Sequence, residues 1–171
     1  MGVDPAPAGQ DLVIRRIDPA EFERVSDITA AAYAARYPEG DPYLPELRDV
    51  AGRAGLCTVL VATDRDGTVL GAVAYVPDSG NPMSEIERDG EAGIRMLAVD
   101  PAAQGRGVGR TLTVACLERA RAEGRTGVAL LTEPDNETAG SLYRSLGFVR
   151  DPERDWEYEP GRLLIAFRLV F

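Results

Sequence analysis

IRMLAVDPAAQGRGVGRTL, residues 94–112, joins a predicted strand to a predicted helix through a turn that contains three glycines. Glycine adopts positive φ angles without strain, and it has no side chain to keep backbone N–H groups away from a ligand. N–H groups at the positive end of a helix dipole bind anions, and Arg106 and Arg110 would add charge-assisted hydrogen bonds. The turn therefore predicts a binding site for an anion such as a diphosphate, rather than a simple change of chain direction.

The glycine fingerprint of dinucleotide-binding domains, Gly-x-Gly-x-x-Gly, does not fit this turn. Counted from Gly105, the third glycine of that fingerprint would fall on Arg110. The turn also comes late in the chain, whereas the fingerprint follows the first strand of its domain.

The chain of 171 residues has the size of one domain, and we expect residues 11–171 to form it after a flexible tail at residues 1–10. Apolar residues (44%) and charged residues (27%) occur in the proportions of a folded globular protein. No apolar run reaches the roughly 20 residues that cross a bilayer, and the first residues lack the apolar core of a signal peptide. These features predict a cytoplasmic protein that does not bind membranes.

The residue types that are absent limit the possible chemistry. The chain contains no histidine, and its 19 basic residues are all arginine. A Ser-His-Asp triad, a histidine metal site, a lysine Schiff base and a Walker A loop are therefore excluded, and we expect no bound metal. Cys57 and Cys116 lie among apolar residues, which predicts buried free thiols. Carboxylates, tyrosines, arginines and backbone groups remain available for chemistry.

The net charge of −9 argues against a nucleic-acid partner. The segment 104–125 differs from the rest of the chain, because it carries only two acids and five arginines, Arg106, Arg110, Arg119, Arg121 and Arg125. The glycine turn thus begins a basic island on an acidic protein.

Hydrophobic periodicity predicts an α/β protein with a mixed sheet. The predicted strands are 12–17, 58–64, 68–76, 91–100, 127–133, 148–151 and 162–171, and the predicted helices are 18–37, 43–55, 109–124 and 137–147. Their order is β-α-α-β-β-β-α-β-α-β-β. The connection 77–90 is long for a loop between strands, which indicates a functional or mobile segment.

Two segments, LAVDPAAQGRGVG (97–109) and NETAGSLYRSLGF (136–148), stand on either side of a helix and a buried strand. In this order they resemble the GCN5-related N-acetyltransferase (GNAT) family. That family holds the diphosphate of acetyl-coenzyme A (acetyl-CoA) with Gln/Arg-x-x-Gly-x-Gly/Ala, and Gln104, Gly107 and Gly109 match its fixed positions. The resemblance covers nearly the whole chain. It implies a mostly antiparallel sheet flanked by helices, and transfer of acetyl from acetyl-CoA to a primary amine of a small molecule or peptide.

The resemblance also implies a set of coenzyme contacts. The strand before the turn would hold the pantetheine arm through the backbone of residues 97–99, and a β-bulge there would free an N–H for the thioester oxyanion. Asn136 matches an asparagine that often contacts the coenzyme, although a helix N-cap explains it equally well. The implied contacts are Leu97, Ala98, Val99, Gln104, Gly105, Arg106, Gly107, Val108, Gly109, Arg110, Thr111 and Asn136.

Two catalytic residues follow from the same comparison. Tyr143 matches the tyrosine that protonates the departing thiolate, for which a neutral phenol is suited, unless it only belongs to the apolar stripe of its helix. Family members that use a glutamate as general base carry it where this chain has Gly93. Glu91, two residues earlier on the same strand face, is the alternative base through water, or else an exposed strand-end carboxylate. Asp78 and Glu133 are further carboxylates that the sequence does not rank.

The acceptor groove of the family varies most, so the resemblance says little about the acceptor. Its candidate parts here are Tyr33, Tyr37, Tyr43, the loop 77–90 and the segment PERDWEYEP (152–160). Five acids in residues 150–159 favour a cationic amine, unless they form only a solvated face. Trp156 either lines a pocket or covers the sheet edge.

Gly93 also motivates a rival to the enzyme: a coenzyme A-binding or sensor protein that has the fold without the chemistry. A nucleotide-phosphate binder unrelated to acyl transfer is a third alternative. The apolar end LLIAFRLVF (163–171) either completes the sheet or pairs with a second copy in a homodimer.

Overall fold

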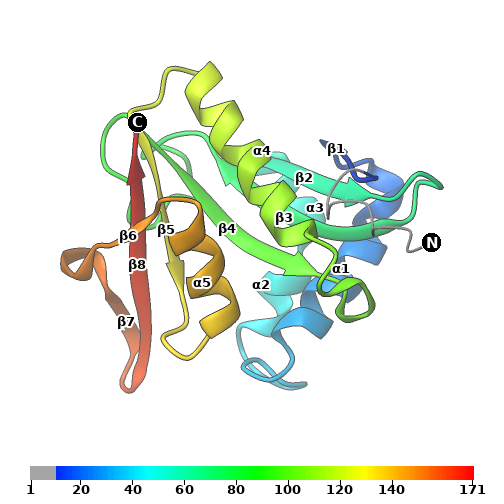
Figure 1. Ribbon diagram of the computed structural model, residues 1–171. Coiled ribbons are helices and arrows are strands. Elements are labelled where there is room, and N and C mark those ends of the chain that lie inside the picture. The colour runs from blue at the N-terminus through cyan, green and yellow to red at the C-terminus, as the bar shows by residue number, and fades with distance from the viewer. Residues whose placement is uncertain (1–10) are drawn as a thin grey trace, which may run out of the picture.

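A computed structural model describes residues 11–171, and Figure 1 shows their arrangement. The flexible tail expected at residues 1–10 lies outside the described residues. The strands are β1 (Val13–Arg16), β2 (Thr58–Thr63), β3 (Val69–Val76), β4 (Glu91–Val99), β5 (Gly127–Thr132), β6 (Val149–Arg150), β7 (Trp156–Glu159) and β8 (Arg162–Val170). The helices are α1 (Phe22–Tyr33), α2 (Leu44–Arg48), α3 (Val50–Leu56), α4 (Val108–Ala122) and α5 (Glu137–Ser145), with short 3₁₀ turns η1 (Pro19–Glu21), η2 (Pro101–Ala103) and η3 (Pro152–Arg154).

All eight strands belong to one sheet, in the order β1-β2-β3-β4-β5-β8-β6, with β7 paired to β8. Among the strands of residues 11–171, only β4 and β5 run parallel to each other, and the other pairs are antiparallel. This confirms the expected fold class, a mixed and mostly antiparallel sheet flanked by helices. The division into a tail and one domain at 11–171 stays a prediction.

Helices cover both faces of the sheet (Figure 1). On one face, Leu112 and Cys116 of α4 and Tyr143 of α5 form the larger core with strand residues such as Ile94 and Phe167. On the other face, α1 packs its apolar side against β2 and β3. The alternation of β2 explains this division, because successive side chains of a strand point to opposite faces.

The central strands β4 and β5 separate partway along their length. Their pairing runs only from Glu91 with Gly127 to Ile94 with Leu130, although β4 continues to Val99. Met96 has a φ of +51°, and the register with β3 shifts between Ala72 and Ala74, which marks a β-bulge. The end of β4 thus has backbone groups on the β5 side that the ladder leaves free, as the diverging arrows in Figure 1 indicate.

The structure differs from the expected elements in three places. The helix expected at 43–55 is two helices, because Asp49 leaves the helical conformation and its side chain accepts a hydrogen bond from the Gly52 N–H (2.9 Å), capping α3. The first helix ends at Tyr33, short of the expected Tyr37. The acidic segment contains a strand, β7, which pairs with β8 across a turn at Gly161.

Cys57 and Cys116 are buried free thiols, as predicted. Within residues 11–171, no helix combines the length and the apolar character that a bilayer crossing requires.

Candidate functional site

The glycine turn has the backbone geometry expected of an anion site. Gly105 and Gly107 have φ angles of +80° and +78°, a region that favours glycine. Gly107 is the N-cap residue of α4, and its carbonyl accepts hydrogen bonds from the Thr111 N–H (3.0 Å) and hydroxyl (2.9 Å). The first N–H groups of α4 have no partner within the helix, so they point out of its positive end.

The arginines of the basic island divide between the two ends of α4. Arg106 and Arg110 are exposed beside the glycine turn, and Arg110 donates to the Ser145 hydroxyl of α5 (2.9 Å). Arg119 and Arg125 instead pair with Glu123 at the far end of the helix. Only the first two arginines therefore add positive charge at the turn.

The end of β4 approaches the start of α4 closely. A Cβ atom on Gly109 would make ordinary contacts with Val99 (3.6 Å), Leu97 (3.8 Å) and Leu142 of α5 (3.6 Å). Ala98 faces the opposite side of the sheet, and the Tyr33 hydroxyl donates to the Leu97 carbonyl (3.1 Å). The structure thus brings together the predicted strand and turn along one continuous edge. The predicted residues Gln104 and Val108 belong to the same turn, Gln104 exposed and Val108 buried.

Tyr143 is buried in the core next to this edge. Its ring lies 5.6 Å from that of Phe148 and 6.0 Å from that of Phe167, between ring centroids. Burial raises the pKa of Tyr143 above the ordinary tyrosine value, and the negative charge of Glu133 acts in the same direction. The phenol is therefore neutral at physiological pH and retains a proton that it can donate.

Asn136 has the capping role that the sequence left open. Its side-chain oxygen accepts a hydrogen bond from the Ala139 N–H (3.1 Å) at the start of α5. Its contact with the coenzyme stays a prediction.

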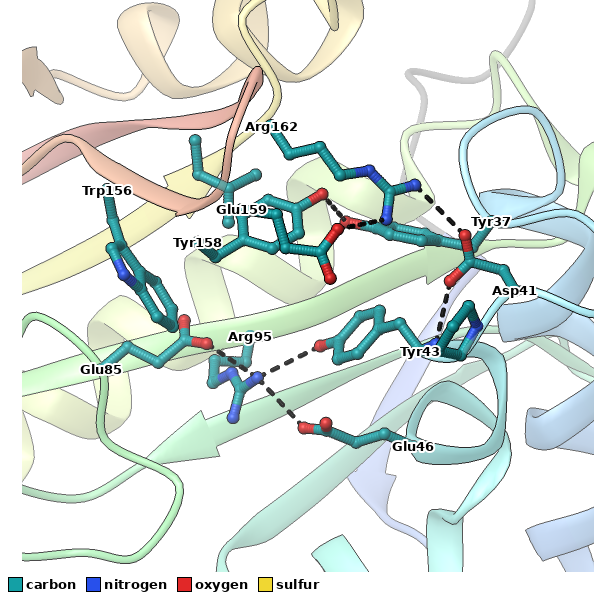
Figure 2. Close-up of a pocket in the computed structure, with 12 residues that line it drawn as sticks. Tyr37, Asp41, Tyr43, Glu46, Glu85, Arg95, Trp156, Tyr158, Glu159 and Arg162 are labelled. Carbon is teal, nitrogen blue, oxygen red and sulfur yellow. Dashed lines mark hydrogen bonds and ion pairs between the residues drawn. The ribbon is translucent and has the colours of Figure 1, made fainter.

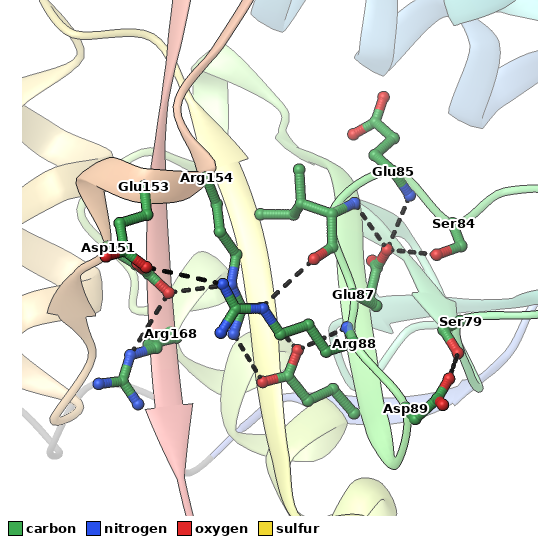
Figure 3. Close-up of polar contacts among 12 residues, drawn as sticks. Ser79, Ser84, Glu85, Glu87, Arg88, Asp89, Asp151, Glu153, Arg154 and Arg168 are labelled. Carbon is green, nitrogen blue, oxygen red and sulfur yellow. Dashed lines mark hydrogen bonds and ion pairs between the residues drawn. The ribbon is translucent and has the colours of Figure 1, made fainter.

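Glu91 is occupied by an ion pair. Both of its oxygens accept hydrogen bonds from the Arg154 guanidinium (2.6 and 3.0 Å), and one also accepts from the Arg88 N–H (2.8 Å). Arg154 also pairs with Asp151 (2.9 Å), to which Arg168 pairs in turn, as Figure 3 shows. Burial alone would raise the pKa of Glu91, but these hydrogen bonds and the charges of Arg154 and Arg88 lower it. The geometry thus gives Glu91 a structural role and disfavours it as a base.

We expect Glu91→Gln to lower the free energy of unfolding by about 2 to 3 kcal/mol at neutral pH, because the largely buried Arg154 loses one of its two carboxylate partners and keeps only Asp151. Since folding lowers the pKa of Glu91, its stabilisation is present above the unfolded pKa of about 4.3 and is lost as the pH falls through the folded value. Urea unfolding of both proteins at pH 7 and near pH 3.5 measures this. An equal difference at both pH values would contradict the assigned ion pair.

A cavity of about 390 Å³ opens on the face of the sheet opposite α4 and α5 (Figure 2). It is bounded by the segment 37–46, by Glu85 of the loop 77–90, by Arg95 of β4, and by the hairpin of β7 and β8. The lining includes four aromatic side chains, Tyr37, Tyr43, Trp156 and Tyr158. Three segments that the sequence suggested for an acceptor groove therefore meet here, and Trp156 lines the pocket. Tyr33 is not among the lining residues.

Two arginines organise the walls of this pocket. Arg95 lies 2.8 Å from Glu85 and 3.5 Å from Glu46, and it donates to the Tyr43 hydroxyl (3.2 Å). Opposite it in Figure 2, Arg162 pairs with Asp41 (3.1 Å) and with Glu159 (3.4 Å). With four carboxylates and two arginines, the lining has an excess of two negative charges. Such a wall favours a positively charged ligand that also stacks on aromatic rings.

The remaining acids of residues 150–159 do not contribute to this pocket. Asp155 pairs with Arg150 (2.8 Å), Asp151 pairs with Arg154 (2.9 Å), and Glu153 lies 3.8 Å from Arg88. Of the five acids, only Glu159 lines the cavity. Asp151, Glu153 and Asp155 are thus held in ion pairs, and Glu157 accepts a hydrogen bond from the Gly161 N–H (2.8 Å), so these four acids do not line the pocket.

Sequence reasoning missed Arg95 and did not single out Glu85. Arg95 alternates with apolar neighbours in β4, so its pattern is that of any solvated strand face. Its importance comes from the loop and the helix that cover it, which lie far away in the sequence.

The model of the acetyltransferase (GNAT) family matches residues 22–148 of the chain. Among solved structures, a GCN5-related N-acetyltransferase from Kribbella flavida is 26% identical, with a TM-score of 0.70 over 95% of this chain and 99% of that one. A GNAT family acetyltransferase from Brucella melitensis in complex with acetyl-CoA is 25% identical, with a TM-score of 0.62 over 94% of this chain and 88% of that one.

The chain is also similar to larger proteins. A mycothiol acetyltransferase from Beutenbergia cavernae is 35% identical over 149 residues, which are 85% of this chain and 47% of that protein. One from Saccharopolyspora erythraea is 38% identical over 112 residues, 66% of this chain and 33% of that protein. The chain therefore spans about half, or less, of the length of these curated relatives.

Proposed function

Because the chain belongs to the GNAT acetyltransferase family, we propose that it transfers an acetyl group from acetyl-CoA to a primary amine. The observation that carries this proposal is the continuous edge formed by the free end of β4 and the left-handed turn at Gly107. On one side of this edge lies the buried phenol of Tyr143, and on the other face of the sheet lies an acidic, aromatic pocket. This arrangement suits a thioester that lies at the end of β4, between the Tyr143 phenol as the acid and an amine acceptor in the pocket.

The coenzyme would bind along this edge by backbone groups. The free N–H groups at the start of α4 suit the diphosphate, with Arg106 and Arg110 beside them. The end of β4 would pair with the pantetheine arm as an added strand, and the bulge at Met96 would present an N–H to the thioester carbonyl. The similarity to a GNAT family acetyltransferase whose structure contains acetyl-CoA supports this ligand.

The reaction that we propose is direct attack without a covalent enzyme intermediate. The amine nitrogen attacks the thioester carbon, the C–N bond forms, and the C–S bond breaks. Tyr143 donates its proton to the departing sulfur. The amine nitrogen loses one N–H proton as the amide forms, and the Tyr143 phenolate regains one proton, so the charges balance. The products are an amide and free coenzyme A.

The acceptor that the pocket supports is a small, positively charged primary amine, or an amine at the end of a peptide. The aromatic rings and the excess of carboxylates favour such a ligand. The name of these relatives points to a mycothiol-related amine as one acceptor to test. We place the enzyme in the cytoplasm, as the sequence predicts.

A coenzyme A-binding protein without catalysis is the second candidate, and Gly93 favours it because the usual glutamate is missing. A screen of amines, aminoglycosides and peptides that detects released coenzyme A as free thiol separates the two candidates. Release that depends on an acceptor rejects the pure binder. Absence of release with every acceptor, while the coenzyme still binds, favours it.

We expect purified protein to bind acetyl-CoA with a Kd of about 1 to 100 µM in titration calorimetry, since the diphosphate and pantetheine contacts together suit that range. ATP and NAD are the controls, and we expect neither to bind measurably at the same concentrations. A protein that binds ATP or NAD but not acetyl-CoA would be a nucleotide-phosphate binder.

A further inference from the structure

Gly93 makes room for a side chain from another segment. A Cβ atom built on Gly93 would lie only 1.7 Å from Oε1 of Glu87, a distance that no side chain tolerates. The Glu87 carboxylate therefore occupies the space in which a side chain at position 93 would begin. The loop 77–90 thus brings a carboxylate to the strand face on which this chain carries none at position 93.

Glu87 uses this place to fix the conformation of its own loop. Its other oxygen, Oε2, accepts hydrogen bonds from the Ser84 hydroxyl (2.6 Å), the Glu85 N–H (2.7 Å) and the Ile86 N–H (3.1 Å). Figure 3 shows these contacts converging on one carboxylate. Arg154 also donates to the Ile86 carbonyl (3.3 Å), which ties the loop to the segment after β6.

The loop held in this way directs Glu85 into the pocket. Glu85 lines the cavity, its side chain is 19% exposed, and one oxygen lies 2.8 Å from Arg95. Arg95 also donates to the Met83 carbonyl (3.3 Å), so the same guanidinium holds the loop from a second side. Gly93 and Arg95 lie on one face of β4, because they are two residues apart before the bulge.

We propose that Glu85 is the general base of the transfer, taking a proton from the ammonium group of the acceptor, and that Glu87 is the positioning residue that holds it there. This inference rests on the proposed function. Glu85 of the loop 77–90 then takes the place of the carboxylate that is missing at Gly93. Gly93 is required for this arrangement, because a side chain at position 93 would displace Glu87.

The proton balance of the step is simple. The Glu85 carboxylate accepts one proton from the R–NH₃⁺ group and passes it to solvent. The neutral amine attacks the thioester carbon, and the N–H proton that it loses afterwards equals the one that the sulfur gains from Tyr143. The sum is R–NH₃⁺ and acetyl-CoA going to the amide, free coenzyme A and one proton.

The surroundings of Glu85 suit a base better than those of the other carboxylates nearby. Burial raises the pKa of Glu85, the charge of Arg95 opposes this rise, and the charges of Glu87 and Glu46 add to it. Tyr43 shares the same guanidinium, and Arg162 and Glu159 face Glu85 from the hairpin across the cavity. Glu46 is 54% exposed, and Glu91 is held by Arg154.

The first experiment compares Glu85→Gln with Glu46→Gln, which removes the other carboxylate that pairs with Arg95. We expect Glu85→Gln to lower kcat by about 10²-fold, and to leave the calorimetric Kd for acetyl-CoA within twofold. In the wild type, kcat/KM should fall as the pH drops through a value above the ordinary glutamate pKa of about 4.3. In Glu85→Gln this fall of kcat/KM at low pH, the acid limb of the profile, should disappear, and kcat/KM should follow the ionisation of the amine alone. Glu46→Gln should keep the acid limb.

The second experiment separates a base at Glu85 from a base at Glu87. Glu87→Gln keeps an oxygen that can accept from Ser84 and the two N–H groups, so it should keep most of the turnover and the acid limb. Glu87→Ala loses these hydrogen bonds, and Gly93→Ala drives the Glu87 carboxylate away, so both should lower kcat by at least about tenfold. A loss of the limb in Glu87→Gln, with the limb kept in Glu85→Gln, would overturn the assignment.

The failure of this inference is distinguishable from the failure of the proposed function. Wild-type protein that binds acetyl-CoA and releases coenzyme A with an amine, while Glu85→Gln retains rate and acid limb, overturns only the role of Glu85. Wild-type protein that binds the coenzyme and turns over no amine overturns both.

Discussion

Tyr143→Phe lowers kcat by about 10³-fold and leaves the Kd for acetyl-CoA within twofold, if the phenol is the acid that protonates the departing thiolate. The substitution removes one hydroxyl and keeps the ring, which packs against Phe148 and Phe167. The hydroxyl has no hydrogen-bond partner among the described residues, so a ligand is the natural partner for its proton. Turnover followed by thiol release, and binding followed by calorimetry, give the two quantities separately.

Tyr75→Phe is the matched control for this experiment. Tyr75 is also a fully buried tyrosine of the larger core, and its hydroxyl donates to Glu123 (2.7 Å), away from the proposed coenzyme edge. Its loss should reduce stability by about 1 kcal/mol and leave kcat within twofold. Unchanged turnover in Tyr143→Phe would remove Tyr143 from the acid role, and equal losses in both variants would indicate a general effect of core packing.

The fold and the geometry of the glycine turn could be predicted because their signals are local in the sequence. The left-handed glycine at position 107, the capping side chain of Asn136 and the stop at Gly147 (φ +93°) each act within one turn of a helix. The strand β7 is absent from the predicted strands, because its alternation W-E-Y-E covers only four residues, two of which are acids. Pairing with β8 outweighs the charge of these acids.

The acceptor side could not be predicted in the same way, because its contacts join distant segments. Glu91 and Arg154 are 63 positions apart in the sequence, and the residue pattern around either of them does not predict their ion pair. The role of Gly93 also depends on a distant segment. In the sequence alone, Gly93 indicates only that the usual glutamate is missing. In the folded chain, the Glu87 carboxylate occupies the space that a side chain at position 93 would fill. This contact forms only when the loop 77–90 folds over β4.

The second large effect is expected at the turn with which the coenzyme edge ends. Gly107→Val should weaken acetyl-CoA binding by about 10²- to 10³-fold, because a β-branched residue at φ +78° is strained and its side chain would stand beside the first N–H groups of α4. A loss of this size corresponds to about 3 to 4 kcal/mol of binding free energy. Titration calorimetry measures it directly.

Gly67→Val separates strain from lost binding. Gly67 also has a positive φ (+83°), in the turn between β2 and β3, and a Cβ atom there would meet open space. Its unfolding free energy should fall by an amount similar to that of Gly107→Val, about 1 to 2 kcal/mol, because both substitutions force the same backbone region. Coenzyme affinity should stay at the wild-type value in Gly67→Val alone. If both variants lost affinity for acetyl-CoA equally, the weaker binding would come from general destabilisation. This result would contradict the proposal that the glycine turn at Gly107 binds the diphosphate.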